Sequence, residues 1–152
     1  MASIGFTCTL SVNDGASNAQ AVVNEVTMIT FPARETTTVD VSYLGMSTPD
    51  KLFVGGLTDN GVCDFECNYT AVEYTRLIAL LGKVKHTSRI PAVGTAVTWK
   101  ITAPDEDGSG GTAAQTLTFN GILTKLDMSA EAEAPMKIKG SIKVSGAITM
   151  AP

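Results

Sequence analysis

The sequence predicts a mainly β protein that has one helix. Apolar residues recur at every second position in several separate stretches, which is the pattern of half-buried strands, whereas helical spacing occurs in only one segment. The many neutral polar residues, mostly threonine, serine and glycine, suit strands and turns. With 152 residues, 44% of them apolar and 17% charged, the chain has the size and the core material of a single domain spanning residues 1–152.

The first part of the chain contains three predicted strands. Over residues 4–12 apolar residues alternate with glycine, threonine and serine, and a turn of small polar residues follows. A second strand covers residues 22–31 and ends at Pro32, because proline cannot donate a hydrogen bond to a neighbouring strand. A third begins near Thr36 and alternates as far as Tyr43.

A long connection of about residues 44–60 follows the third strand. It carries Leu52, Phe53 and Val54 between glycines and charged residues, which is more hydrophobicity than a solvated loop usually has. We therefore expect this connection to contact a partner.

A fourth strand and the only helix come next. After an Asn-Gly turn signal at 60–61, apolar residues alternate with acidic and amide residues over 63–69. Thr70 and Glu73 form a capping box, which predicts a helix over about 70–82 that ends at Gly82. We expect its apolar stripe to pack on the sheet, with Arg76 pointing outward. The stripe consists of Tyr74, Leu77, Ile78 and Leu81.

The remaining sequence predicts a hairpin and a long closing strand. Residues 97–101 alternate, an acidic and glycine-rich tip follows over 104–111, and the returning strand begins at Leu117. Gly121 shifts the phase of that strand, which indicates a bulge or a tight Asn-Gly turn. Alternation then continues from Met136 to Met150, more than twice the usual strand length of about five or six residues. Such a strand must bend across two sheets or continue into a neighbouring subunit.

Charge and targeting signals disfavour several classes of protein. Fifteen acidic and eleven basic residues give a net charge of −4, and the basic residues are scattered, which disfavours a nucleic-acid grip. No stretch reaches the roughly 20 apolar residues of a membrane-spanning helix, and the first residues do not form a signal peptide, so we expect synthesis in the cytoplasm. The three cysteines have no regular spacing and are predicted to be buried thiols.

Catalytic and zinc signals are weak. His86 is the only histidine, and no nucleophile motif accompanies it, so we predict no catalytic residue and no enzyme. A zinc site would need His86 together with Cys8, Cys63 and Cys67. The last two fall on one predicted strand, whereas zinc sites usually take their cysteines from tight knuckles.

A calcium site is weakly indicated in the acidic hairpin tip. Asp105, Asp107 and Ser109 match the opening of a calcium-binding loop, yet Thr116 stands where the bidentate glutamate is required. We therefore predict a solvated hairpin tip, no metal and no cofactor.

The order of these elements resembles the tail tube (major tail) proteins of long-tailed bacteriophages, which are related to the ring proteins of type VI secretion. The likeness lies in the strands at 26–32 and 39–42, the loop that ends in a Gly-Leu-x-Asp-x-Gly turn at 56–61, and the Thr-Phe-Asn-Gly segment at 118–121. The resemblance implies a β-sandwich or partly closed barrel of about seven or eight strands, flanked by the one helix.

The resemblance also implies a structural subunit whose hexameric rings stack into a tube for genome delivery. Such a subunit would belong to the virion tail and to the host cytoplasm before assembly, with tape measure, tail terminator and distal tail proteins as partners. Double-stranded DNA would pass through the lumen without specific binding. Six copies at −4 each would carry −24 per ring, so we hypothesise that an acidic lumen repels the DNA backbone.

The predicted contacts between subunits fall into two sets. The first, in the long connection, comprises Tyr43, Leu44, Lys51, Leu52, Phe53, Val54 and Leu57. The second, in the terminal strands, comprises Ile4, Phe6, Ile142, Val144 and Ile148. Two alternatives stay open: a type VI secretion-like ring protein, which neighbouring sheath genes would favour, and a small jelly-roll binding module, which exposed aromatic clusters would favour.

Overall fold

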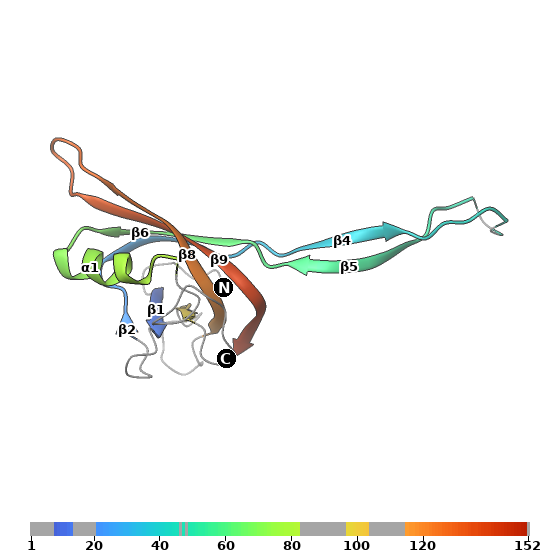
Figure 1. The fold of residues 1–152 in the computed structure, drawn as a ribbon, viewed down its shortest axis with the longest axis horizontal. Coiled ribbons are helices and arrows are strands. Elements are labelled where there is room, and N and C mark those ends of the chain that lie inside the picture. Colours follow the sequence, from blue (N-terminus) through green and yellow to red (C-terminus); the bar gives the residue numbers. More distant parts are fainter. Residues whose placement is uncertain are drawn as a thin grey trace, which may run out of the picture.

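The computed structural model describes residues 8–13, 21–45, 47, 49–82, 97–103 and 115–151. These residues form nine strands and one helix, which confirms the mainly β class with a single helix (Figure 1). In chain order the elements are β1 (Thr9–Asn13), β2 (Ala21–Val22), β3 (Val26–Thr30), β4 (Glu35–Asp40), β5 (Phe53–Asp59), β6 (Val62–Asn68), α1 (Ala71–Leu80), β7 (Thr98–Thr102), β8 (Thr116–Ser129) and β9 (Lys137–Ala151).

Seven strands form one antiparallel sheet in the order β2-β1-β7-β8-β9-β6-β3, and β4 and β5 form a separate pair. The two edge strands, β2 and β3, are separated along the chain by only three residues, at 23–25. The sheet must therefore curl until its edges nearly meet, and β1 does approach β3. This curled sheet is the partly closed sandwich that the resemblance implies.

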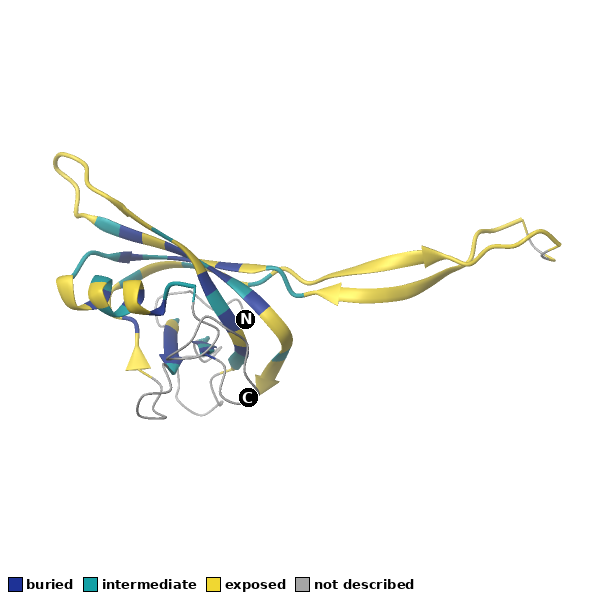
Figure 2. Cartoon of the chain, viewed as in Figure 1, coloured by how far each residue is buried: buried dark blue, intermediate teal, exposed yellow. Residues whose placement is uncertain are grey.

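The core lies inside the curl (Figure 2). Trp99 on β7 and Phe65 on β6 are both fully buried, and their ring centroids are 6.3 Å apart. Trp99 Nε1 donates a hydrogen bond to the carbonyl of Gly121 at 3.2 Å, so its buried donor is satisfied. Gly140 lies directly across from Phe65, and a Cβ there would meet the ring at 2.5 Å. The aromatic pair therefore requires glycine at this position.

The two longest strands are kept continuous by bulges. The register of β8 and β9 shifts between Phe119 and Asn120, so the phase change at Gly121 is the predicted bulge and not a turn. On β9 the same irregularity includes Gly146, whose φ of +82° suits glycine. Figure 1 shows β9 bending along its length, which accounts for a strand of 15 residues within one molecule.

The predicted helix is confirmed in position and corrected in phase. The hydroxyl of Thr70 accepts a hydrogen bond from the backbone N–H of Glu73 at 3.3 Å, and Gly82, with φ +72°, follows the helix end. Ile78 was expected on the packed face but is 42% exposed. The buried helical residues are Glu73, Leu77 and Leu80.

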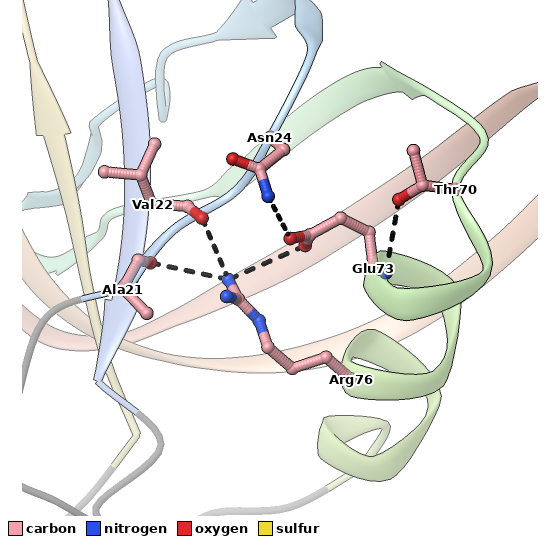
Figure 3. Close-up of polar contacts among 6 residues, drawn as sticks. All are labelled: Ala21, Val22, Asn24, Thr70, Glu73 and Arg76. Atoms are coloured by element: carbon pink, nitrogen blue, oxygen red, sulfur yellow. Dashed lines mark hydrogen bonds and ion pairs between the residues drawn. The ribbon is translucent and has the colours of Figure 1, made fainter.

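A buried polar cluster explains this phase (Figure 3). Asn24 Nδ2 donates to Glu73 Oε1 at 2.9 Å, and Arg76 Nη2 lies 3.7 Å from Glu73 Oε2. Arg76 Nη2 also donates to the carbonyls of Ala21 and Val22, each at 3.4 Å. Arg76 thus points toward β2 and not outward as predicted, because a buried carboxylate needs partners. These contacts connect α1 with residues 21–24, which include β2 and the start of the link to β3.

Two strand predictions need correction. The single strand expected over residues 22–31 is two strands, β2 and β3, interrupted at Glu25, whose φ is +54°. The connection expected over residues 44–60 contains β5, which pairs with β4. The glycines Gly55 and Gly56 interrupt the alternation of β5, and both faces of the strand are exposed, so no half-buried pattern marks it in the sequence.

Candidate assembly surface

A hairpin of β4 and β5 projects from the body of the molecule (Figure 1). We call residues 35–59 the arm. Its two strands pair with each other and with no other strand of the described structure. Only Asn60 and Gly61 separate β5 from β6, so the arm continues the strand direction of the main sheet.

One side of the arm is apolar and uncovered. The register pairs Val39 with Val54, and the N–H of Val41 donates to the carbonyl of Leu52 at 2.9 Å. Directly paired residues share a face of a sheet. These four side chains, which we call the arm face, are Val39, Val41, Leu52 and Val54, with exposed fractions of 52%, 44%, 49% and 51%. Every residue of both strands is exposed (Figure 2), and an isolated hairpin is at best marginally stable in water, so the arm face needs a cover.

The middle of the arm is shaped by a bulge. The hydroxyls of Thr36 and Thr58 are hydrogen-bonded across the strands at 2.9 Å, and the register then shifts before Thr38. A Cβ at Gly56 would lie 2.6 Å from Thr37 Oγ1, so glycine permits the close approach that the bulge requires.

Side-chain hydrogen bonds support the outer part of the arm. The N–H of Ser42 donates to Asp40 Oδ1 at 2.9 Å, and the N–H of Leu52 donates to Ser42 Oγ at 2.9 Å. The hydrogen bonds from Ser42 lower the pKa of Asp40. Asp40 therefore stays ionised at neutral pH on the side of the arm opposite the arm face.

The root of the arm is fixed to β9. Lys143 Nζ lies 2.9 Å from Asp59 Oδ1, the oxygen that also accepts from the N–H of Gly61 at 2.9 Å. The hydrogen bond from Lys143 is the main cause that lowers the pKa of Asp59. Asn60 Nδ2 donates to the carbonyl of Gly146 at 2.5 Å. These contacts set the direction in which the arm leaves the sheet.

The structure gathers the first set of predicted contacts on or beside the arm. All seven residues are exposed, and the fraction reaches 87% at Leu57 and 101% at Leu44. Their role as contacts stays a prediction. Val39 and Val41 were not among the predicted contacts, although the alternation of the third strand already placed both on one face.

Two of the five residues in the second set of predicted contacts are unsuited to that role. Ile142 is fully buried and Val144 is 6% exposed, so both belong to the core of this chain and cannot contact a neighbour. Their face of β9 is the one that lines the curl of the sheet. Ile148 is half-buried, and Ile4 and Phe6 lie outside the described residues.

Metal ligation and thiol reactivity find no support among the described residues. They contain no group of three or more histidine, cysteine, aspartate or glutamate side chains that could hold a metal ion. Cys63 and Cys67 are buried free thiols, as predicted, whereas Cys8 is a free thiol that is only partly buried. Burial raises the pKa of Cys63 to about 12 and that of Cys67 to about 11, so neither is a thiolate at neutral pH. His86 and the predicted hairpin tip at 104–111 lie outside the described part. No helix in the described ranges is long and apolar enough to cross a membrane.

Comparison with known proteins finds solved structures that share this fold. No family model and no curated protein matches the sequence. Solved structures do match. A chain in the tail of an empty gene transfer agent particle, refined with C6 symmetry, is 13% identical and aligns over 99% of this chain and 100% of its own length, with a TM-score of 0.69. The chain has the fold of this tail protein.

Other matches with this fold come from an extracellular contractile injection system. A chain from the sheath/tube terminator of an extracellular contractile injection system is 11% identical, and one from the sheath-tube complex of the same system is 12% identical. The first aligns over 100% of this chain and 98% of its own length with a TM-score of 0.68, and the second over 95% and 87% with 0.62. At these identities the likeness is one of fold. It spans the arm as well as the curled sheet.

Proposed function

We propose that this protein is the repeating subunit of a phage tail tube, in which six copies form a ring and rings stack into a conduit for double-stranded DNA. The proposal combines this fold with the C6 symmetry of a particle whose tail contains a similar chain. The subunit acts by assembly and not by catalysis. It belongs to the virion tail, after synthesis in the host cytoplasm.

The observation that carries the proposal is the arm face. Four apolar side chains remain about half exposed on a hairpin whose two strands pair with no other strand among the described residues. Apolar surface of this kind is stabilised when a partner covers it. A second copy of the chain, in the same ring or the next, is the partner that a repeating tube always supplies.

The sheet edges support the same conclusion. β2 and β3 are edge strands, and exposed edges pair readily with other chains unless they are covered. Met28 on β3 is 48% exposed, and Phe31 just beyond it is 43% exposed. Closure of six copies into a ring would cover such edges and leave none free. Tape measure, tail terminator and distal tail proteins would meet the assembly only at its ends or within its lumen.

The proposal is tested by the size of the protein in solution. Sedimentation over a range of concentrations should show a species of six times 15.8 kDa, or about 95 kDa, and larger multiples that grow with concentration. A variant in which residues 41–52 are replaced by an Asn-Gly turn joins Asp40 to Phe53, which already pair, and should fold but not assemble. A closed dimer that grows no further in the wild type would contradict the proposal.

A second candidate is the tube of a contractile injection system, since chains from such a particle match with TM-scores of 0.68 and 0.62. This role shares the ring and the arm contacts but requires a surrounding sheath. Electron microscopy of native particles distinguishes the two, because the second candidate predicts a contractile sheath around the tube and the first does not need one.

A further inference from the structure

The face of the main sheet that points away from the core carries an ordered set of charges. We call it the polar sheet face. The name covers only the part over β6, the second half of β8 and the first half of β9, so Lys100 on β7, which also points away from the core, lies outside it. Its lysines are Lys125 on β8 and Lys137, Lys139 and Lys143 on β9. Asp64 and Glu66 on β6 and Asp127 on β8 supply three carboxylates, and Asp59 at the arm root supplies a fourth. The register places the first three beside the lysine strand, with Glu66 and Asp127 on either side of Lys139.

Each of the four lysines has a carboxylate close by. Glu66 lies between two of them, with Oε1 2.7 Å from Lys137 Nζ and Oε2 3.8 Å from Lys139 Nζ. Lys125 Nζ is 3.0 Å from Asp127 Oδ2. Lys143 pairs with the carboxylate at the arm root, as described above. Among the described residues, the lysines of this face are therefore all neutralised locally.

The charge balance of the face differs from that of the chain. Four lysines and four carboxylates cancel, so the net charge of −4 is carried by the rest of the molecule. The hydrogen bond from Lys137 is the main cause that lowers the pKa of Glu66, so this carboxylate remains ionised well below neutral pH. Surface ion pairs of this kind stabilise a fold by only about 0–1 kcal/mol each, so stability alone does not account for the arrangement.

The direction of the arm indicates where this face lies in a tube. The arm continues the strand direction of β6 (Figure 1), so an arm that reaches the next ring aligns the strands broadly with the tube axis. One face of the sheet then points to the lumen and the other outward. The core and α1 occupy one face, which leaves the charged and hydrated polar sheet face as the one suited to a lumen wall.

We propose that the polar sheet face is a self-neutralised surface that meets polyanionic DNA without binding it, because its carboxylates keep four clustered lysines from the phosphates. This inference rests on the proposed function, since DNA is the cargo assumed. The sequence suggested that an acidic lumen repels the DNA backbone. In this inference DNA is not bound because the lysines of the polar sheet face are paired with neighbouring carboxylates. Removal of the carboxylates should turn the same face into a DNA-binding surface.

The test compares two variants with the same net charge. In the first, Asp64→Asn, Glu66→Gln and Asp127→Asn remove three carboxylates from the polar sheet face. In the second, Asp50→Asn, Glu131→Gln and Glu133→Gln remove three exposed carboxylates elsewhere. Binding to a fluorescent duplex of about 20 base pairs is measured at several salt concentrations, and thermal melting checks that both variants are folded.

The expected result is that the first variant binds the duplex at least about tenfold more tightly than the second. The three freed lysines, Lys125, Lys137 and Lys139, should give a slope of log affinity against log salt of about −3, since each phosphate contact contributes about −0.9. Equal affinity of the two variants would overturn the inference. If the triple variant does not fold, Glu66→Gln alone frees Lys137 and Lys139 and should give a slope of about −2. The assay needs no assembled tube, so a failure of ring formation would count against the proposed function and not against this result.

Discussion

Replacement of Leu52 and Val54 by serine should weaken assembly and leave folding intact. Both side chains lie on the arm face and are 49% and 51% exposed. Full burial of such a side chain contributes about 1.5–3 kcal/mol, so covering the exposed half contributes about 0.7–1.5 kcal/mol for each. Loss of both removes about 1.5–3 kcal/mol. Because about 1.4 kcal/mol corresponds to a factor of ten, the association constant should fall about 10- to 150-fold.

The assay is the protein concentration at which assemblies begin to pellet in the ultracentrifuge, which should rise by the same factor. The melting temperature should change by less than about 2 °C, because surface substitutions usually alter stability by less than about 0.5 kcal/mol. Val72→Ser on the exposed side of α1 is the control for the Val54→Ser change, since it makes the same exchange at a position that is 76% exposed. An unchanged pelleting threshold would refute the role of the arm face, and a melting temperature that falls together with assembly would show that the face stabilises the monomer.

Three further predictions concern the body of the molecule. Gly140→Ala should lower the free energy of unfolding by about 1–3 kcal/mol, because the new methyl group meets a buried ring. Gly55→Ala, whose nearest atom is 3.8 Å away, should change it by less than about 0.5 kcal/mol, and equal effects in denaturant titrations would contradict the packing described. Cys63 and Cys67 should resist a thiol reagent at about pH 8 until the protein is unfolded, so labelling of either in the folded state would argue against their burial. The pKa of Glu66 is lowered on folding, so the stability it contributes is present above its unfolded pKa of about 4.3 and is lost as pH falls through the folded value. The melting temperature of the wild type should therefore fall more than that of Glu66→Gln between about pH 5 and pH 3, and parallel falls would contradict the pairing.

Much of the strand framework could be predicted because alternation records which face of a strand is buried. The fourth strand and the closing strand were predicted within two residues of β6 and β9, since both have one core face and one polar face. The bulge at Gly121 could also be predicted, because a glycine and a phase change coincide there. The same alternation could not show that Ile142 and Val144 face the core of their own chain and not a neighbour.

The arm could be predicted only in part. The hydrophobic residues at 52–54 indicated a partner contact, but β5 itself carried no alternating signal, because its glycines interrupt the pattern and neither face is buried. A strand stabilised by another molecule lacks the half-buried pattern within a single chain. The residues of the arm face were therefore found from the register that pairs Val39 with Val54.

The helix was predicted correctly in position but not in phase. Apolar residues lie on more than one side of α1, so spacing alone permits two packed faces. The choice is made by Glu73, which is buried against Asn24 from a distant part of the chain. Such a long-range polar contact has no local signal in the sequence.

Electron microscopy of the purified protein, negatively stained over a range of concentrations, shows directly whether the chain forms rings and tubes. We expect rings with sixfold symmetry that stack into hollow tubes, with density between neighbouring subunits where the arm face is covered. A compact particle that stays monomeric or closes as a dimer at all concentrations, with the arm still uncovered, would contradict this expectation.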